Sequence, residues 1–176
     1  MSFHSFGLPH SFIDILQREQ YKNPYPIQQA VIPLILKGRD VLGIAPTGSG
    51  KTASYVLPVL SRLNHIKKAK DRQVDVLVLV PTRELAEQVK KVFLLFEKGL
   101  EHSVPTMAVY GGVSINPQMK ALFGISVLVA TPGRLLDLVS SNAVRFDQLQ
   151  TLILDEADKL LNLGFKDEMS QIFALL

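Results

Sequence analysis

Residues 45–52, APTGSGKT, place glycine, lysine and hydroxyl side chains at a spacing that suits phosphate binding. The amides of such a turn, with the helix N-terminus after it, offer hydrogen-bond donors and a positive dipole to phosphate oxygens. Lys51 would reach the terminal phosphates, and the Thr52 hydroxyl can bind Mg²⁺. This P-loop predicts a nucleotide site. Its contacts are assigned to Thr47, Gly48, Ser49, Gly50, Lys51 and Thr52.

Two carboxylates, Asp155 and Glu156, follow a second apolar run much later in the chain. At the end of a buried strand, Asp155 can hold Mg²⁺ through water and Glu156 can orient the attacking water. Each pattern alone also fits an ordinary loop or the solvated end of a strand. Together, and in this order, they favour nucleotide hydrolysis, with Lys51, Asp155 and Glu156 as catalytic candidates and Thr52 and Asp155 as metal ligands.

The elements that position these residues follow from the apolar pattern. Near-continuous apolar runs, which suit a parallel sheet buried on both faces, predict strands. They cover residues 41–44, 74–80, 106–110, 126–130 and 151–154. Apolar residues at helical spacing predict helices over residues 11–18, 26–38 and 84–97, and another after the P-loop. The prediction is a three-layer α/β fold with a mainly parallel sheet, in which the polar stretch 65–73 forms a loop.

Composition limits the possible classes of protein. The 176 residues are 47% hydrophobic and 20% charged, which predicts one globular domain with a buried core. The chain has no Cys, so it has neither a disulfide nor a thiolate metal site. No long apolar run or leader pattern is present, so we expect a cytoplasmic protein without a membrane partner. A net charge of +3 permits nucleic-acid binding without arguing for it.

Several motifs now stand in register, and the chain resembles the N-terminal RecA-like domain of the DEAD-box RNA helicases. The signature motif is residues 155–158, DEAD. The other matching strings are NPYPIQQ at 23–29 (Q motif), PTRELA at 81–86 (motif Ia), Gly111 and Gly112 (GG motif) and TPGR at 131–134 (motif Ib). The resemblance covers almost the whole chain. The loop at residues 111–118 is also similar to that of the bacterial RhlE-like branch.

The resemblance gives the Q motif a role in recognising the base. The Gln28 amide would contact the N6 amino group and N7 of adenine and select ATP over GTP. Tyr21 would stack on the adenine ring, and Phe3 matches an isolated upstream aromatic; both also fit the core. Two residues depart from the family pattern: Gln20 stands where Gly is usual and Tyr25 where Thr is usual, so the local backbone path is in question.

The resemblance also assigns RNA contacts to turns at the C-terminal edge of the sheet, where open α/β sheets bind ligands. Free amides, hydroxyls and cations there would hold the RNA backbone without reading its sequence. Each position also fits an ordinary helix cap, and Arg134 fits an internal salt bridge equally well. The residues are Pro81, Thr82, Arg83, Gly111, Gly112, Thr131, Pro132, Gly133 and Arg134.

By the same resemblance, the cofactors are ATP and Mg²⁺, and the partners are RNA and a second RecA-like domain. Residues 1–38 would be a Q-motif region of the same domain as residues 39–176. Motif III, the second domain and its arginine finger would lie beyond Leu176, which makes the chain half an enzyme or less. A strand between the P-loop strand and the DEAD strand would also be missing, leaving a gap in the sheet or a rearranged pairing.

The resulting interpretation is the ATP-binding half of an ATP-dependent RNA helicase, nearly inactive alone. Two other classes stay open. The first is a non-catalytic module that binds ATP or RNA, which an ATPase assay separates from an enzyme. The second is a P-loop ATPase that acts on DNA, which competition between RNA and DNA would reveal.

Overall fold

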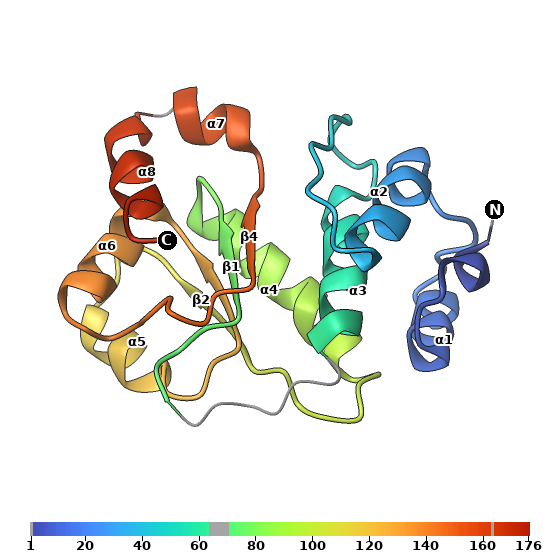
Figure 1. Ribbon diagram of the computed structural model, residues 1–176, viewed down its shortest axis with the longest axis horizontal. Coiled ribbons are helices and arrows are strands. Elements are labelled where there is room, and N and C mark those ends of the chain that lie inside the picture. The colour runs from blue at the N-terminus through green and yellow to red at the C-terminus, as the bar shows by residue number, and fades with distance from the viewer. Residues whose placement is uncertain (1, 64–70, 163) are drawn as a thin grey trace. The chain divides into compact units, whose positions relative to one another are not determined.

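The computed structural model describes residues 2–63, 71–162 and 164–176, and it has an α/β fold (Figure 1). Its elements are η1 (Phe3–Phe6), α1 (His10–Arg18), α2 (Pro26–Leu36), α3 (Lys51–Leu63), β1 (Val76–Leu79), α4 (Arg83–Glu97), β2 (Thr106–Val109), α5 (Ile115–Ala121), β3 (Val127–Ala130), α6 (Pro132–Ser140), β4 (Thr151–Leu154), α7 (Ala157–Asn162) and α8 (Lys166–Phe173). The chain divides into two compact units. The first comprises Met1–Lys67 and Val92–Val104, and the second Lys68–Lys91 and Pro105–Leu176.

The second unit contains a four-stranded sheet in the order β2-β3-β1-β4, with every pair parallel. Leu77 of β1 lies opposite Leu128 of β3 on one side and Leu152 of β4 on the other. Four of the five predicted strands are thus confirmed, with β4 matching its predicted bounds and the others shorter. β1 and β3 are buried along their whole length, as the near-continuous apolar runs predicted.

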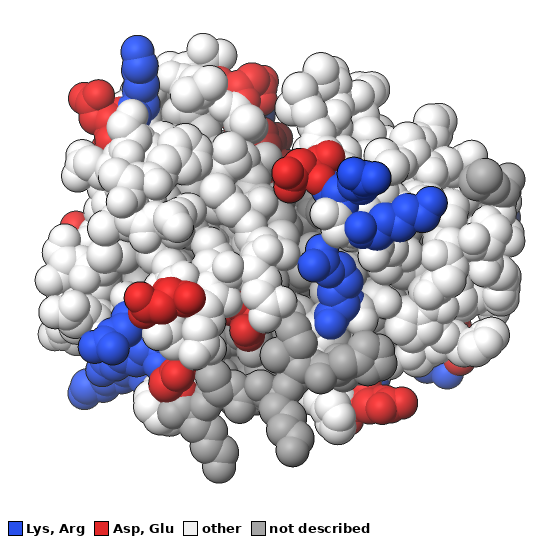
Figure 2. All heavy atoms as spheres, viewed as in Figure 1, with Lys and Arg blue, Asp and Glu red and all other residues white. Residues whose placement is uncertain are grey.

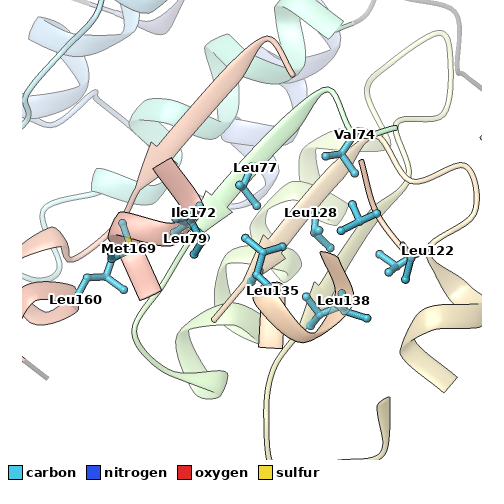
Figure 3. Packing of buried hydrophobic residues seen from close by; sticks show 14 residues of the cluster. Val74, Leu77, Leu79, Leu122, Leu128, Leu135, Leu138, Leu160, Met169 and Ile172 are labelled. Carbon is cyan, nitrogen blue, oxygen red and sulfur yellow. The ribbon is translucent and has the colours of Figure 1, made fainter. Parts of the chain in front are cut away.

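One face of this sheet carries the core of the second unit (Figure 3). Leu77 and Leu79 project from β1 to the same side because strand side chains alternate between faces. Helices α6 and α8 pack side by side, and their apolar residues join this cluster. The cluster also includes Leu128, Leu135, Leu138, Leu160, Met169 and Ile172.

The predicted strand at residues 41–44 is wrong, because no strand forms there in the described structure. Leu42 and Ile44 are each 86% exposed. Within the described sheet, β4 pairs with β1 alone and ends at the exposed Leu154. An apolar run becomes a strand only where a neighbour completes its backbone hydrogen bonds. β4 is thus an edge strand of the described sheet, and the missing strand, with a gap or a rearranged pairing, stays a prediction.

The first unit is helical. Helix α2 packs against α3, and η1 lies against α1. Helix α2 ends before the predicted residue 38, because Gly38 turns the backbone left-handed at φ 71°. Phe12 of α1 and Phe96 of α4 are both fully buried, with ring centroids 6.0 Å apart. The confirmed helices at the predicted positions are α1, α2, α3 and α4.

The described surface mixes both signs of charge. Figure 2 shows Lys and Arg side chains interspersed with Asp and Glu on the face that it draws. Residues 65–70 of the predicted polar loop lie outside the described residues; Gln73 at its end forms an isolated parallel bridge with Arg145. None of the helices in the described part of the chain has the length and apolar character needed to cross a membrane.

Candidate functional site

The P-loop forms a tight turn that leads directly into α3, which begins at Lys51. Gly48 and Gly50 take left-handed φ angles of 79° and 83°, a conformation that glycine adopts without steric strain. The Lys51 ammonium donates hydrogen bonds to the carbonyls of Ala45, at 2.5 Å, and Pro46, at 3.2 Å. The predicted phosphate-binding lysine is therefore held close to the turn that precedes it.

Ser49 has a buried hydroxyl at this turn. Its hydroxyl oxygen is buried, yet it has no hydrogen-bond partner among the described residues. An unpaired buried hydroxyl destabilises a fold unless something binds it, and a phosphate oxygen is a suitable acceptor. A Cβ added at Gly48 would meet no atom within 4 Å, so the loop is open at this point. These features fit a bound phosphate group.

Gln28 of the Q motif is fully buried and contacts the P-loop. Its Oε1 accepts a hydrogen bond from the Tyr25 backbone N–H at 2.9 Å, and its Nε2 donates to the Gly50 carbonyl at 3.2 Å. A Cβ on Gly50 would lie only 2.4 Å from that Nε2, so glycine is required there. Sequence reasoning missed this link. The amide can still make one more bond through each group, which leaves a base contact possible.

Tyr21 lies in an aromatic cluster. Its ring meets Phe3 and Phe96 edge to face, with centroids 6.5 Å and 6.4 Å away. Phe3 is buried and so supports Tyr21 from the core side. Burial raises the pKa of the Tyr21 phenol, and Glu19 and Tyr25 raise it further. The stacking of Tyr21 on a base stays a prediction.

Gln20, just after the end of α1, has a left-handed backbone conformation. Its φ is 61°, and its N–H and that of Tyr21 donate to the carbonyls of Gln17 and Leu16. This is a Schellman motif, which ends a helix with a left-handed residue that is usually glycine. The backbone path that was in question at Gln20 is therefore the glycine path, adopted here by a residue with a Cβ.

In the second unit, the predicted RNA motifs line one hollow of about 530 Å³. The predicted residues that line it are Pro81, Thr82, Arg83, Gly111, Thr131, Gly133 and Arg134. Gly112 and Pro132 adjoin this lining without belonging to it. Sequence reasoning missed four further lining residues: Glu84, which belongs to the motif Ia string but was given no RNA contact, and Tyr110, Asp137 and Phe165, which lie outside the motifs.

The two basic residues of this hollow differ in their surroundings. The Arg83 side chain is 64% exposed, and its Nε lies 2.6 Å from the Glu84 carboxylate. Arg134 is only 8% exposed; its Nη2 donates to the Val113 carbonyl at 2.7 Å, and its Nε lies 3.5 Å from Asp137. Its Nε and Nη1 have no hydrogen-bond partner among the described residues. Arg134 thus has the internal contacts that sequence analysis left open, and its RNA contact stays a prediction.

Thr82 also has an internal role, because its hydroxyl accepts a hydrogen bond from the Leu85 N–H at 3.2 Å. This bond satisfies a free amide in the first turn of α4, as a helix cap does. Thr131 precedes α6 without such a side-chain bond. The Thr82 hydroxyl is therefore already used in a helix cap, whereas the Thr131 hydroxyl makes no cap bond.

Asp155 and Glu156 follow β4 in the second unit, whereas the P-loop belongs to the first. The buried Asp155 accepts a hydrogen bond from the Glu156 N–H at 3.0 Å. Glu156 has a φ of 50°, which is rare for a residue with a Cβ and is often found at functional sites. Its carboxylate lies 2.9 Å from the Lys159 ammonium, and this hydrogen bond raises the pKa of Lys159.

Metal-binding side chains are not clustered in the described part of the chain. Residues 2–63, 71–162 and 164–176 contain no group of three or more His, Asp or Glu side chains placed to hold a metal ion. Mg²⁺ does not require one, because it keeps several waters and takes one or two protein oxygens with substrate phosphates. The Thr52 hydroxyl and the Asp155 carboxylate are oxygen donors of the kind that Mg²⁺ prefers.

Comparison with known proteins agrees with these motifs. Residues 25–176 match the family model described as DEAD/DEAH box helicase. The chain is 46% identical to the ATP-dependent RNA helicase DeaD of Buchnera aphidicola subsp. Baizongia pistaciae, over 98% of this chain and 28% of that protein. It is 41% identical to the DEAD-box ATP-dependent RNA helicase CshA of Streptococcus pneumoniae, over 99% of this chain and 32% of that protein.

Solved structures give the same result. The RNA helicase Prp28 from Chaetomium thermophilum, bound to ADP, matches with a TM-score of 0.86 and 38% identity, over 97% of this chain and 42% of that one. A DEAD box protein from Methanococcus jannaschii matches with a TM-score of 0.88 and 32% identity, over 99% and 47%. The chain spans roughly a third of the curated relatives, 28% and 32% in the two above. The resemblance to the RhlE-like branch stays a prediction. The chain belongs to the DEAD/DEAH box helicase family.

Proposed function

We propose that this chain is the ATP-binding part of an ATP-dependent RNA helicase, which couples ATP hydrolysis to local unwinding of RNA. The observation that carries the proposal is the P-loop, which holds Lys51 at the turn while the buried Ser49 hydroxyl lacks a partner among the described residues. A buried donor beside a lysine, at the start of a helix, suits a phosphate chain. The same proposal places the protein in the cytoplasm.

ATP is the nucleotide that these residues would select. The P-loop amides, Ser49 and Lys51 would bind the phosphates, and Gln28 would read the adenine edge while bonded to Gly50. Tyr21 would lie against the base, supported from behind by Phe3 and Phe96. The Prp28 structure contains ADP, so an adenine nucleotide is the first ligand to test.

Hydrolysis would use residues from both motifs. Thr52 and Asp155 would hold Mg²⁺, which neutralises charge on the phosphate oxygens when it is bound. Glu156 would orient the attacking water, and its bond to Lys159 gives its carboxylate a defined position. The unusual backbone of Glu156 fits this role, since strained residues persist where function fixes them.

RNA would bind at the hollow of the second unit. Helix N-termini after Thr82 and Thr131 would face phosphates, and the exposed Arg83 would add a cation. Backbone contacts of this kind carry no sequence code, so binding would be independent of RNA sequence. The second RecA-like domain is expected in the remainder of a longer protein, since the relatives are about three times as long as this chain.

Substitution of Lys51 tests the proposal. In the full-length protein, we expect Lys51→Ala to abolish ATP binding or RNA-stimulated hydrolysis while the thermal unfolding curve keeps its shape, because Lys51 compensates phosphate charge rather than packing a core. Lys37→Ala, which removes an exposed lysine from the end of α2, is the matched control and should behave as the wild type. Near-normal RNA-stimulated ATPase activity of Lys51→Ala would refute the P-loop assignment.

Two measurements on the wild-type protein separate the other classes. ATP binding without hydrolysis, in the presence or absence of RNA, would show a non-catalytic binding module. Stronger binding to DNA than to RNA of one sequence would indicate an ATPase that acts on DNA. We expect hydrolysis that RNA stimulates more than DNA, because contacts to the 2′-hydroxyl distinguish the two.

A further inference from the structure

The GG loop, residues 110–114, is hydrogen-bonded from both ends by buried side chains. Gln118 of α5 donates from Nε2 to the Tyr110 carbonyl at 3.3 Å, just before the two glycines. Arg134 of α6 donates from Nη2 to the Val113 carbonyl at 2.7 Å, just after them. Gln118 and Arg134 are 9% and 8% exposed, whereas residues 111–114 are exposed. Two side chains from different helices thus clamp a solvent-facing loop.

The loop needs such support because its glycines provide none. A Cβ built on Gly111 or Gly112 would meet no atom within 4 Å, so the space where a side chain would project is open at both glycines. Gly112 has a φ of 81°, and glycine has more backbone freedom to lose than any other residue. Without the two side-chain bonds, this backbone would sample many conformations.

Tyr110, at the N-terminal end of the loop, is also held by a bond from its side chain. The Tyr110 hydroxyl donates to the Glu87 carboxylate of α4 at 3.1 Å, and Glu87 also lies 3.5 Å from the Lys90 ammonium. The bond to Glu87 raises the pKa of Tyr110. Tyr110 is therefore held through its side chain and its carbonyl together.

We infer that Gln118 and Arg134 are positioning residues that hold the Gly111–Gly112 backbone in the shape that receives the RNA strand, with Arg134 acting through the Val113 carbonyl rather than as a phosphate cation. This inference rests on the proposed RNA binding at the hollow, which Gly111 and Arg134 both line. The competing role is direct phosphate contact, because Nη1 of Arg134 has no hydrogen-bond partner among the described residues. The two roles differ in how RNA affinity depends on salt.

Glycine-selective ¹⁵N relaxation tests the clamp without RNA, because it reports the mobility of the Gly111 and Gly112 amides directly. In the full-length protein, the order parameters of these amides should be about 0.85 and should fall below about 0.6 in Gln118→Ala and in Arg134→Ala. Asn116→Ala removes an exposed amide from the same helix and is the matched control for Gln118→Ala. It should leave the order parameters unchanged. Unchanged order parameters in both clamp variants would overturn the inference.

RNA affinity measured at several salt concentrations tests the functional half, with a single-stranded oligouridine as the probe. Gln118→Ala and Arg134→Ala should weaken binding by about fivefold to tenfold, as the loss of roughly one hydrogen bond implies. The slope of log affinity against log salt should stay unchanged for both. Arg83→Ala, which removes an exposed cation, should lower that slope by about 0.7, the share of one phosphate contact on a single strand.

The outcomes separate the possible failures. A salt slope lowered by Arg134→Ala, with the loop order parameters unchanged, would overturn the inference and make Arg134 a phosphate ligand. Lower order parameters with unchanged RNA affinity would also overturn it, because the clamped loop would then not serve RNA binding. If the wild type binds no RNA, the proposed function fails, and the order parameters still decide whether the clamp exists.

Discussion

Helices α1 and α2 are both followed by a residue in the left-handed conformation, which is Gln20 after α1 and Gly38 after α2. At each helix end, the left-handed residue and the one after it donate to carbonyls of the last turn, which makes two Schellman motifs in one unit. Gly38 has a φ of 71° and Gln20 a φ of 61°. Only Gln20 has a Cβ that makes this conformation unfavourable. The backbone at Tyr21 is therefore fixed by a strained residue.

The first prediction is that Gln20→Gly stabilises the protein by about 0.5 to 1 kcal/mol, because it removes left-handed strain and the entropy of the unfolded glycine offsets only part of the gain. Gln17→Gly is the matched control, since Gln17 is an exposed residue inside α1. It should destabilise the protein by about 1 kcal/mol. Urea denaturation of both variants measures the effect. Equal destabilisation by both would show that Gln20 contributes contacts that outweigh its strain.

The second prediction concerns Gln28, whose amide bonds Gly50 and is proposed to read adenine. Gln28→Ala should weaken ATP by about 1 to 3 kcal/mol more than GTP, the usual worth of a bidentate base contact. Loss of the Gly50 bond should add a smaller penalty that both nucleotides share. Titrations of fluorescent ATP and GTP measure the difference.

Gln29→Ala is the control for Gln28→Ala, because the neighbouring Gln29 amide donates to the Pro24 carbonyl at 2.9 Å rather than to the P-loop. It should leave the preference for ATP intact. Equal losses of ATP and GTP affinity in Gln28→Ala would mean that Gln28 acts only through the shape of the P-loop.

At the scale of secondary-structure elements, a strand forms where an apolar run also has a neighbouring strand to pair with. The runs that became β1, β2, β3 and β4 were predictable because each is apolar and has a neighbour in the sheet. Residues 41–44 are also an apolar run, yet they form no strand. No described strand lies beside them to accept and donate the hydrogen bonds of their backbone. The apolar character of residues 41–44 was therefore not enough to make them a strand.

The candidate site was likewise only partly predictable from the sequence. The sequence assigned roles to the P-loop, Asp155 and Glu156 because the residue types within each short motif fit one chemistry, and these roles stay predictions. The Arg134 bond to Val113 was not predictable, because its acceptor is a backbone carbonyl distant in sequence, and any residue type has one. The contact of Gln28 with Gly50 escaped prediction for the same reason.

The third prediction follows from the exposure of Leu42, which is 86%. In the 176-residue chain, Leu42→Ser should change the free energy of unfolding by less than about 0.5 kcal/mol, as exposed substitutions do. Leu57→Ser, at a fully buried position of α3, should cost about 3 kcal/mol or more. Thermal or urea unfolding measures both. A large loss for Leu42→Ser would place it in a buried strand.

The whole chain holds the two halves of the proposed chemistry in separate units, the P-loop in one and Asp155 with Glu156 in the other. The surface that Figure 2 draws mixes both charges, and the net charge is only +3. Non-specific attraction to RNA is therefore expected to be modest and sensitive to salt. In the proposed mechanism, strand separation would need RNA held across two domains, and this chain spans roughly a third of its curated relatives, 28% and 32% of two of them.

ATP hydrolysis and duplex unwinding by residues 1–176, compared with the full-length protein under the same conditions, test the central proposal most directly. We expect the full-length protein to hydrolyse ATP with RNA stimulation and to unwind a short duplex. The 176-residue chain should unwind nothing and hydrolyse ATP slower by about 10³ to 10⁵, the effect of lacking an arginine finger. Robust RNA-stimulated turnover or unwinding by the 176-residue chain alone would contradict the proposal that it is only part of the enzyme.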